Sequence, residues 1–261
     1  MAKGIGSPST SSWAGTPCWT GPRRKLHHPD TQDAAMKTNY AAHDAIYEAR
    51  RAAGKPGWQE PQSLRDTLAS LAERMKSEHA PRSGRVLELG CGAGDLSLAL
   101  AEHGYEVHGV DIAPTAIDWA REKAAARGLS AHFEAGSVLE LPGLREGFFD
   151  MVLDGYCFHC IIGPDRARFL ASARRALKPG GVLHVATMCG EVTSDALRSV
   201  FDPSSRCVLD ADGVATRYIG LPEDILSEIE ASGFQVLASK VRPRRDVERD
   251  MDELQVWATP A

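Results

Sequence analysis

The segment that most constrains the fold of this chain is Val86–Asp95, which reads VLELGCGAGD. An apolar run typical of a buried strand leads into three alternating glycines, and a helical pattern follows at once. Glycine tolerates sharp left-handed turns and places no Cβ between the backbone and a ligand. The first turn of a helix presents unpaired N–H groups that favour a carboxylate or a phosphate. The segment therefore predicts a strand–loop–helix unit that binds a ligand at its loop.

The glycine spacing separates this loop from two related ones. The dinucleotide pattern G-x-G-x-x-G, aligned on Gly90 and Gly92, requires a glycine at position 95, where this chain has Asp95. The Walker phosphate loop requires Gly-Lys-Ser/Thr, which does not follow here. Since a glycine-rich loop alone is a weak signal, a second feature is needed.

That second feature is an acid at the end of the next apolar run. Asp111 ends the stretch VHGVD and lies 17 residues after Gly94. In a Rossmann-like unit, a carboxylate about 20 residues beyond the loop hydrogen-bonds the ribose hydroxyls of a nucleotide. The two features together predict a site for an adenosyl-type ligand.

Beyond Arg82, short apolar runs alternate with amphipathic segments, which predicts a parallel sheet with helices on both faces. The expected strands are Arg85–Leu89, Glu106–Asp111, Ala131–Glu134, Phe149–Asp154, Val182–Thr187, Phe234–Val241 and Glu253–Thr259. The expected helices are Asp95–His103, Pro114–Arg127, Pro164–Ala176 and Pro222–Ala231. The last two strands should pair at the sheet edge, with the final strand antiparallel. The predicted fold class is α/β, a Rossmann-like seven-stranded, mostly parallel sheet.

From roughly Arg82 to Thr259 the chain resembles the class I S-adenosylmethionine-dependent methyltransferases. Three motifs carry the resemblance, and together they are specific: ELGCGAG (Glu88–Gly94), GVDIAP (Gly109–Pro114) and LKPGG (Leu177–Gly181). The resemblance implies S-adenosylmethionine as the cofactor and methyl transfer as the reaction.

The resemblance also implies a role for individual residues of the cofactor site. Glu88 would lie near the methionine end, Asp111 would bind the ribose, and Ile112 would pack on the adenine. The family often has an aspartate after its third strand that contacts the adenine; this chain has Ser137 there, whose hydroxyl or backbone would make that contact. The remaining predicted cofactor-binding residues are Gly90, Gly92, Gly94, Val138 and Asp154.

The loop after the fourth predicted strand should border the methyl acceptor, because ligands of open parallel sheets lie at the carboxyl ends of the strands. His159 is the candidate general base if the acceptor is an alcohol, a phenol or an ammonium, and a packing role is its alternative. A soft nucleophile such as a thiol needs no base. The cluster Cys157, His159 and Cys160 does not match a structural zinc pattern, so no metal is predicted.

Three further segments lie outside the predicted sheet. Residues 1–35 are rich in Gly, Ser, Thr and Pro and are expected to be a disordered extension. Residues 36–80 are expected to form a helical cap on the methyltransferase domain 36–261. Residues 188–220 are expected to form a lid, with Val200, Phe201, Tyr218 and Ile219 available to line a pocket. Gly54–Trp58 (GKPGW) faintly resembles the Trp-bearing segment of thiol and thiopurine S-methyltransferases, which adds sulfur acceptors to the candidates.

The amino-acid composition limits the classes of binding partner that are expected. The 261 residues contain 30 Lys and Arg against 35 Asp and Glu, and the formal net charge of -5 offers no overall attraction to nucleic acid. The sequence has neither a membrane-length apolar run nor an apolar secretory leader, so a cytoplasmic location is expected. The leading hypothesis is a methyltransferase of small molecules. The alternatives are an RNA or protein methyltransferase, and a non-catalytic S-adenosylmethionine-binding regulatory protein.

Overall fold

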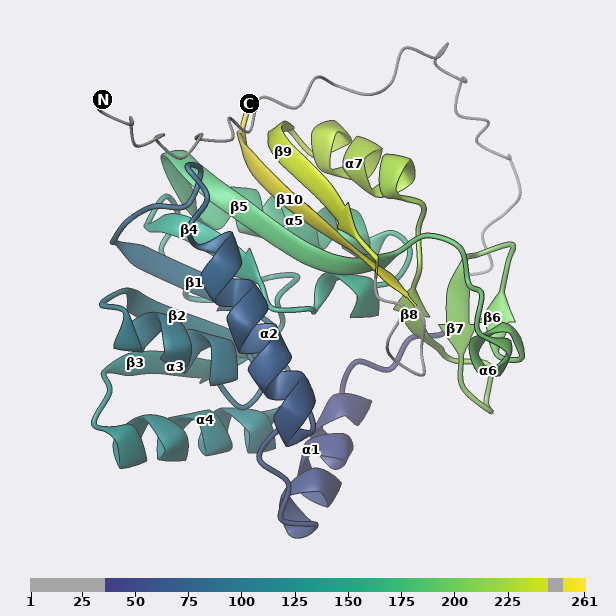
Figure 1. Ribbon diagram of the computed structural model, residues 1–261, viewed down its shortest axis with the longest axis horizontal. Helices are drawn as coiled ribbons and strands as arrows, with labels where there is room; N and C mark the ends of the chain where they lie inside the picture. The colour runs from purple at the N-terminus through teal and green to yellow at the C-terminus, as the bar shows by residue number, and fades with distance from the viewer. Residues whose placement is uncertain (1–35, 244–250) are drawn as a thin grey trace, which may run out of the picture. The chain divides into compact units, whose positions relative to one another are not determined.

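The computed structural model of the chain describes residues 36–243 and 251–261. The expected disordered extension, residues 1–35, lies outside the described residues, and so does most of the charged connector before the last strand. Figure 1 shows the described helices and strands. The helices are α1 (Ala42–Ala52), α2 (Pro61–Arg74), α3 (Asp95–Glu102), α4 (Pro114–Arg127), the 3-10 turn η1 (Phe158–Cys160), α5 (Asp165–Ala176), α6 (Asp195–Arg198) and α7 (Pro222–Ala231).

Seven strands form the main sheet in the order β3-β2-β1-β4-β5-β10-β9. They are β1 (Arg85–Leu89), β2 (Glu106–Asp111), β3 (Ala131–Ala135), β4 (Phe149–Asp154), β5 (Leu177–Cys189), β9 (Phe234–Arg242) and β10 (Asp252–Pro260). β1 pairs in parallel with both β2 and β4, whereas β10 is antiparallel to both β5 and β9. The Rossmann-like fold class and the antiparallel last strand are confirmed.

Helices pack on both faces of the sheet, as the alternating pattern predicts. On one face, α2 and α3 lie against the sheet (Figure 1), and Leu71 and Leu96 from these helices join a core with Met151 and Trp257. On the other face, side chains of α5 and α7 pack on β4, β5 and β10. Because the central strands are covered on both sides, the buried positions of β1 and β4 are mostly apolar, and the buried carboxylates Glu88 and Asp154 are exceptions that need a function.

The lid segment contains strands that the sequence does not predict. Residues 188–220 include α6 and a small antiparallel sheet of β6 (Phe201–Asp202), β7 (Cys207–Leu209) and β8 (Ala215–Tyr218). These strands are two to four residues long. Such short runs give too few alternations for a periodicity to be recognised.

Several predicted boundaries differ from the structure by one or two residues, and the start of β5 differs by more. β5 begins at Leu177 rather than Val182, because Leu177 pairs with Phe149 before an irregularity in the register. The LKPGG motif therefore lies within the strand. Pro164 caps α5 instead of forming its first turn.

Among the residues described, no helix is both long and apolar enough to cross a membrane. The cytoplasmic location stays a prediction.

Candidate functional site

A cavity of about 420 Å³ lies at the carboxyl ends of the parallel strands. This volume is within the range of small-molecule sites. Its walls combine the loops after β1, β2, β3 and β4 with parts of α1, of α2 and of the lid segment. The lining residues include Tyr40, His43, Tyr47, Trp58, Leu64, Glu88, Gly90, Gly92, Asp111, Ile112, Ser137, Val138, Tyr156, Cys157, His159, Cys160, Ile161, Met188, Arg217, Met251 and Glu253.

The three loop glycines all have positive φ angles, of 72° at Gly90, 51° at Gly92 and 78° at Gly94. A Cβ on Gly90 would lie 2.4 Å from Cβ of Cys157, and one on Gly92 would lie 2.1 Å from Oη of Tyr47. Gly90 and Gly92 therefore let the loop pass under the neighbouring walls of the cavity. Gly94 does not line the cavity; it is the N-cap of α3.

Asp111 connects the glycine loop to the helix that follows β2. One carboxylate oxygen, Oδ2, accepts a hydrogen bond from the Gly92 N–H at 2.8 Å, and Oδ1 accepts one from the Ala113 N–H at 2.9 Å. A carboxylate has about four acceptor positions, so two remain for a ligand. Burial raises the pKa of Asp111, and the two N–H donors oppose that shift.

Glu88 is buried at the floor of the cavity, where Ser97 Oγ donates a hydrogen bond to its Oε2 at 2.5 Å. Burial raises the pKa of Glu88 to about 8, and the Ser97 hydrogen bond partly offsets this effect. A Cβ on Gly155 would lie 2.2 Å from Oε1 of Glu88, so the loop after β4 also requires a glycine at its closest approach. A cationic ligand group near Glu88 would favour its ionised form.

The loops after β2 and β3 form an apolar wall of the cavity, and hydrogen bonds fix the position of this wall. Ile112 lines the cavity with 37% of its surface exposed, which is unusual for a large aliphatic side chain. Val138 is buried and lines the same cavity. The Ser137 Oγ accepts a hydrogen bond from the Leu139 N–H at 3.2 Å, so this hydroxyl already serves the turn.

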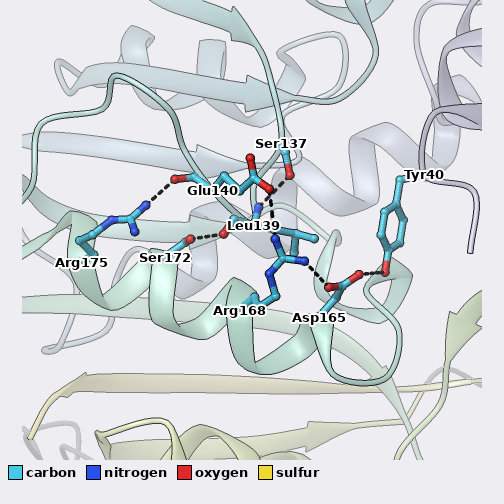
Figure 2. Close-up of polar contacts among 8 residues, drawn as sticks. All are labelled: Tyr40, Ser137, Leu139, Glu140, Asp165, Arg168, Ser172 and Arg175. Carbon is cyan, nitrogen blue, oxygen red and sulfur yellow. Dashed lines mark hydrogen bonds and ion pairs between the residues drawn. The ribbon is translucent and has the colours of Figure 1, made fainter. Parts of the chain in front are cut away.

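Figure 2 shows how this wall is attached to α5. Ser172 Oγ donates to the Leu139 carbonyl at 2.6 Å, and Arg168 forms ion pairs with Glu140 and Asp165. Tyr40, which also lines the cavity, donates its hydroxyl to Asp165 at 3.1 Å. The contacts join the loop after β3 to the segment before α1, so both walls of the cavity are positioned by one helix.

The residues after β4 form the other end of the cavity. His159 lines it, and its Nδ1 has no hydrogen-bond partner among the described residues. Burial, followed by the charge of Arg217, lowers the pKa of His159 to about 3. His159 is therefore neutral at physiological pH, and it is a weaker base than its position in the sequence suggests.

Asp154 lies behind the cavity wall and does not line it. Its Oδ1 accepts hydrogen bonds from the Cys157 N–H at 2.7 Å and the Phe158 N–H at 2.9 Å. The structure thus places Asp154 where it orders the loop that carries Cys157 and His159. Asp150 has a comparable structural role, since it accepts a hydrogen bond from the Arg85 N–H at 2.8 Å and pairs with Lys178.

The prediction of which lid-segment residues line the cavity is wrong. Val200, Phe201, Tyr218 and Ile219 do not line the cavity; Phe201 and Ile219 pack in a separate apolar cluster. The lid segment contributes Met188 and Arg217 instead.

The N-terminal helical segment supplies residues that the sequence reasoning missed. Tyr47 of α1 lies over the glycine loop, and its ring packs 5.3 Å from Trp58. Asp44 Oδ1 accepts a hydrogen bond from the Thr115 N–H at 2.8 Å, at the start of α4. The spacing of His43 and Tyr47, one helical turn apart, was an available signal that they share a face.

Comparison with known proteins matches the central part of this site. Residues 86–181 match a family model described as a methyltransferase domain. Over 110 residues the chain is 42% identical to a demethylmenaquinone methyltransferase of Thermus thermophilus, covering 41% of this chain and 48% of the relative. Over 128 residues it is 34% identical to ribosomal RNA small subunit methyltransferase C of Alcanivorax borkumensis, covering 46% of this chain and 37% of the relative. The chain thus spans less than half the length of either curated relative.

A solved structure is similar over most of the chain. It belongs to work on the conversion of a disulfide bond into a thioacetal group during echinomycin biosynthesis, and it is 25% identical with a TM-score of 0.61. The similarity covers 85% of this chain and 92% of that one.

The fold and the site define a Rossmann-like α/β protein with a ligand cavity at the carboxyl ends of its strands. Within that class, residues 86–181 match the methyltransferase domain family, and the motifs and fold are those of the class I S-adenosylmethionine-dependent methyltransferases. S-adenosylmethionine is accordingly its cofactor.

Proposed function

We propose that this protein transfers the methyl group of S-adenosylmethionine to a small-molecule acceptor that binds in the 420 Å³ cavity. The observation that carries the proposal is Asp111, which holds the glycine loop and the start of α4 while keeping acceptor positions for a ribose. When bound, the cofactor supplies a methyl group activated on a sulfonium.

The chemistry of the cavity wall fits this cofactor. The exposed Ile112 offers an apolar surface for a purine, with Val138 beside it. Glu88 offers a buried carboxylate for an ammonium, and Gly90 and Gly92 keep the loop free of side chains. We assign Asp154 and Gly94 to positioning, because both lie outside the cavity lining.

The protein's contribution to the reaction is then largely positional. Holding a nucleophile in line at roughly 3–3.5 Å from the methyl carbon supplies a large part of a methyl-transfer acceleration. We propose that the neutral imidazole of His159 hydrogen-bonds the acceptor and orients its lone pair, donating to an ionised acceptor and accepting from a protonated one. Because the pKa of His159 is lowered to about 3, a thiol or an already ionised acceptor suits this site better than a neutral alcohol.

The walls above the cavity support a small acceptor. We propose that residues 36–80 act as a cap and residues 188–220 as a lid, since Tyr47, Trp58, Met188 and Arg217 all face the cavity. A demethylmenaquinone methyltransferase among the relatives acts on a small molecule by its name. A ribosomal RNA methyltransferase also matches, over a smaller share of its length, and makes RNA the second candidate.

Two experiments test the proposal. Titration calorimetry with S-adenosylmethionine should show binding to the wild type and a clear loss of affinity in Asp111→Ala. The matched control is Asp118→Ala, which removes an exposed carboxylate of α4 that pairs with Arg121. Equal affinity of wild type and Asp111→Ala would contradict the assignment of the ribose site.

The acceptor class is tested with a methyl-labelled donor and a fractionated cell extract. We expect label in the small-molecule fraction together with S-adenosylhomocysteine. Label confined to RNA or protein would favour the second candidate. Cofactor binding without any S-adenosylhomocysteine formation would favour a regulatory protein.

A further inference from the structure

We infer that Arg217 anchors an acidic group of the methyl acceptor, so that the substrate is a small, largely apolar molecule bearing a carboxylate or a phosphate. The inference rests on the proposed function and specifies its substrate class. Neither the sequence motifs nor the family's cofactor site involves this residue.

The lid sheet brings Arg217 to the cavity. Arg217 lies on β8, where it pairs with Val208 of β7. The chain just after β8 lies against the end of β5, because Gly220 forms a parallel bridge with Cys189 and its carbonyl accepts a hydrogen bond from the Gly190 N–H at 2.9 Å. Arg217 lines the cavity together with His159 and Cys160 of η1. After burial, the positive charge of Arg217 is the largest cause of the lowered pKa of His159. This effect agrees with a guanidinium near the end of the cavity where the methyl acceptor is predicted to bind.

The guanidinium of Arg217 is not used by the fold. Among residues 36–243 and 251–261, it has no hydrogen bond, ion pair or aromatic stacking partner. The neighbouring Arg206 differs, because it donates to the Ile219 and Gly190 carbonyls at 2.7 and 2.6 Å. Arg166 also differs, because it pairs with Glu228 at 2.7 Å and stacks on Phe158. The lid segment thus uses Arg206 for structure and leaves Arg217 to the cavity.

The five acids of the cavity wall, Asp252 among them, have partners other than Arg217. Asp95 pairs with Lys123 at 2.7 Å, Glu88 binds Ser97, and Asp111 binds two backbone N–H groups. Glu253 accepts the Tyr156 hydroxyl at 2.8 Å. Of the described residues lining the cavity, Arg217 is the one arginine or lysine. A half-buried guanidinium of this kind is suited to bind a carboxylate or a phosphate through two parallel hydrogen bonds.

The surroundings of Arg217 describe the rest of the acceptor. Ile161, Met188 and Met251 line the cavity and offer an apolar, adaptable surface, and Trp58 adds an aromatic one. A molecule with an apolar body and one acidic end matches both features. Methionine side chains also tolerate acceptors that differ in shape, so the acidic end would provide most of the orientation.

The inference is tested with three probes that share a phenyl ring: benzoate, phenyl phosphate and neutral benzamide. Each is titrated by calorimetry into the protein saturated with S-adenosylhomocysteine. The variants are Arg217→Gln and Arg217→Lys. The matched control is Arg198→Gln, which changes an exposed arginine of the same segment outside the cavity.

We expect the wild type to bind benzoate or phenyl phosphate roughly tenfold more tightly than benzamide, the ratio that one charge-assisted hydrogen-bonded pair supplies. Whichever of the two anions binds more tightly identifies a carboxylate or a phosphate. Arg217→Gln should bind all three probes equally, Arg217→Lys should retain part of the preference, and Arg198→Gln should match the wild type.

Three results would overturn the inference. They are the absence of saturable binding by any probe, equal binding of anions and benzamide by the wild type, and a loss of S-adenosylhomocysteine affinity in Arg217→Gln. The last result would mean that Arg217 contacts the cofactor. Because cofactor binding by the wild type is measured first, a failure of the proposed function is distinguished from a failure of the anchor.

Discussion

The Oδ1 atom of Asp44 accepts a hydrogen bond from the Thr115 N–H at 2.8 Å, across 71 positions of sequence. The N-cap of α4 is Ala113, which has no side chain able to cap the helix. α1 therefore caps the helix that follows Asp111 and Ile112, and it couples the N-terminal cap of the domain to the cofactor wall. Arg51 of α1 reinforces this contact by pairing with Glu122 of α4.

Asp44→Ala should lower the free energy of unfolding by roughly 1 kcal/mol, as for other lost N-caps, and should weaken S-adenosylmethionine binding. Asp44→Asn should preserve most of the stability and most of the cofactor affinity, because the amide oxygen still accepts the hydrogen bond. Denaturant unfolding and calorimetry measure the two effects. Asp66→Ala, which changes an exposed aspartate of α2, is the control. Unchanged cofactor affinity in Asp44→Ala would show that α4 holds its position without α1.

The contact between Gly92 and Tyr47 predicts the outcome of a pairwise substitution. Gly92→Ala carries a left-handed backbone cost of roughly 1–2 kcal/mol and also places its Cβ 2.1 Å from Tyr47 Oη. Gly128→Ala serves as the reference, because its φ is also positive, at 64°, and no atom lies within 4 Å of the new Cβ. Gly92→Ala should therefore destabilise the protein more than Gly128→Ala does.

Adding Tyr47→Phe to Gly92→Ala removes the hydroxyl that the new Cβ would meet. The double variant should therefore regain the stability lost to this clash, but not the stability lost to the left-handed backbone. Thermal and denaturant unfolding of the wild type, the two single variants and the double variant give the free energies of unfolding for a double-mutant cycle. If the two substitutions are additive, Tyr47 does not limit the space above the loop, and the assignment of α1 to the cavity wall is wrong.

Local sequence determines the part of this site that could be predicted. The strand Arg85–Leu89 is recognisable from its apolar run, its loop from the alternating glycines, and Asp111 from its distance along the chain. Each of these is a relationship between residues close in sequence. The α4 boundaries, Pro114–Arg127, were predicted correctly because a proline and a glycine mark them.

The remainder depends on contacts between distant segments. Asp44 caps α4, and Arg217 lines the cavity together with His159, only because α1 and the lid sheet fold back over the strands. Asp154 illustrates the converse case. Its position at the end of β4 is predicted correctly, but the direction of its carboxylate is set by the Cys157 and Phe158 N–H groups. No periodicity or motif contains that information.

The raised pKa of Glu88 predicts how stability depends on pH. The folded-state pKa of about 8 exceeds the ordinary value of 4.5, so between these values the folded protein retains a proton that the unfolded chain has lost. The free energy of unfolding should thus fall as the pH rises from about 5 to about 8, by at most about 1.4 kcal/mol per pH unit from this group.

Glu88→Gln should reduce that slope, because glutamine cannot ionise and still accepts the Ser97 hydrogen bond. Urea unfolding between pH 5 and pH 8 measures it, and Glu102→Gln on the exposed side of α3 is the control. Asp154, whose pKa is raised to about 7, contributes equally to both proteins and cancels in the comparison. If the free energy of unfolding changes with pH in the same way for the wild type and Glu88→Gln, Glu88 is ionised in the folded protein from pH 5 to pH 8.

His159 supplies the last prediction, which concerns its suitability as a base. Because burial and the Arg217 charge lower its pKa to about 3, its imidazole should stay neutral from pH 5 to pH 8 in the protein without ligand. Two-dimensional NMR of the imidazole nitrogens, with the His159 signals assigned from their loss in His159→Gln, should show constant shifts over this range. Free imidazole in the same sample reports a normal titration. Arg217→Gln should raise the pKa of His159 by removing the positive charge that lowers it most, whereas Arg198→Gln should leave it unchanged. A His159 midpoint near 6.5 in the wild type would instead restore this residue as a conventional general base and would favour alcohol acceptors over thiols.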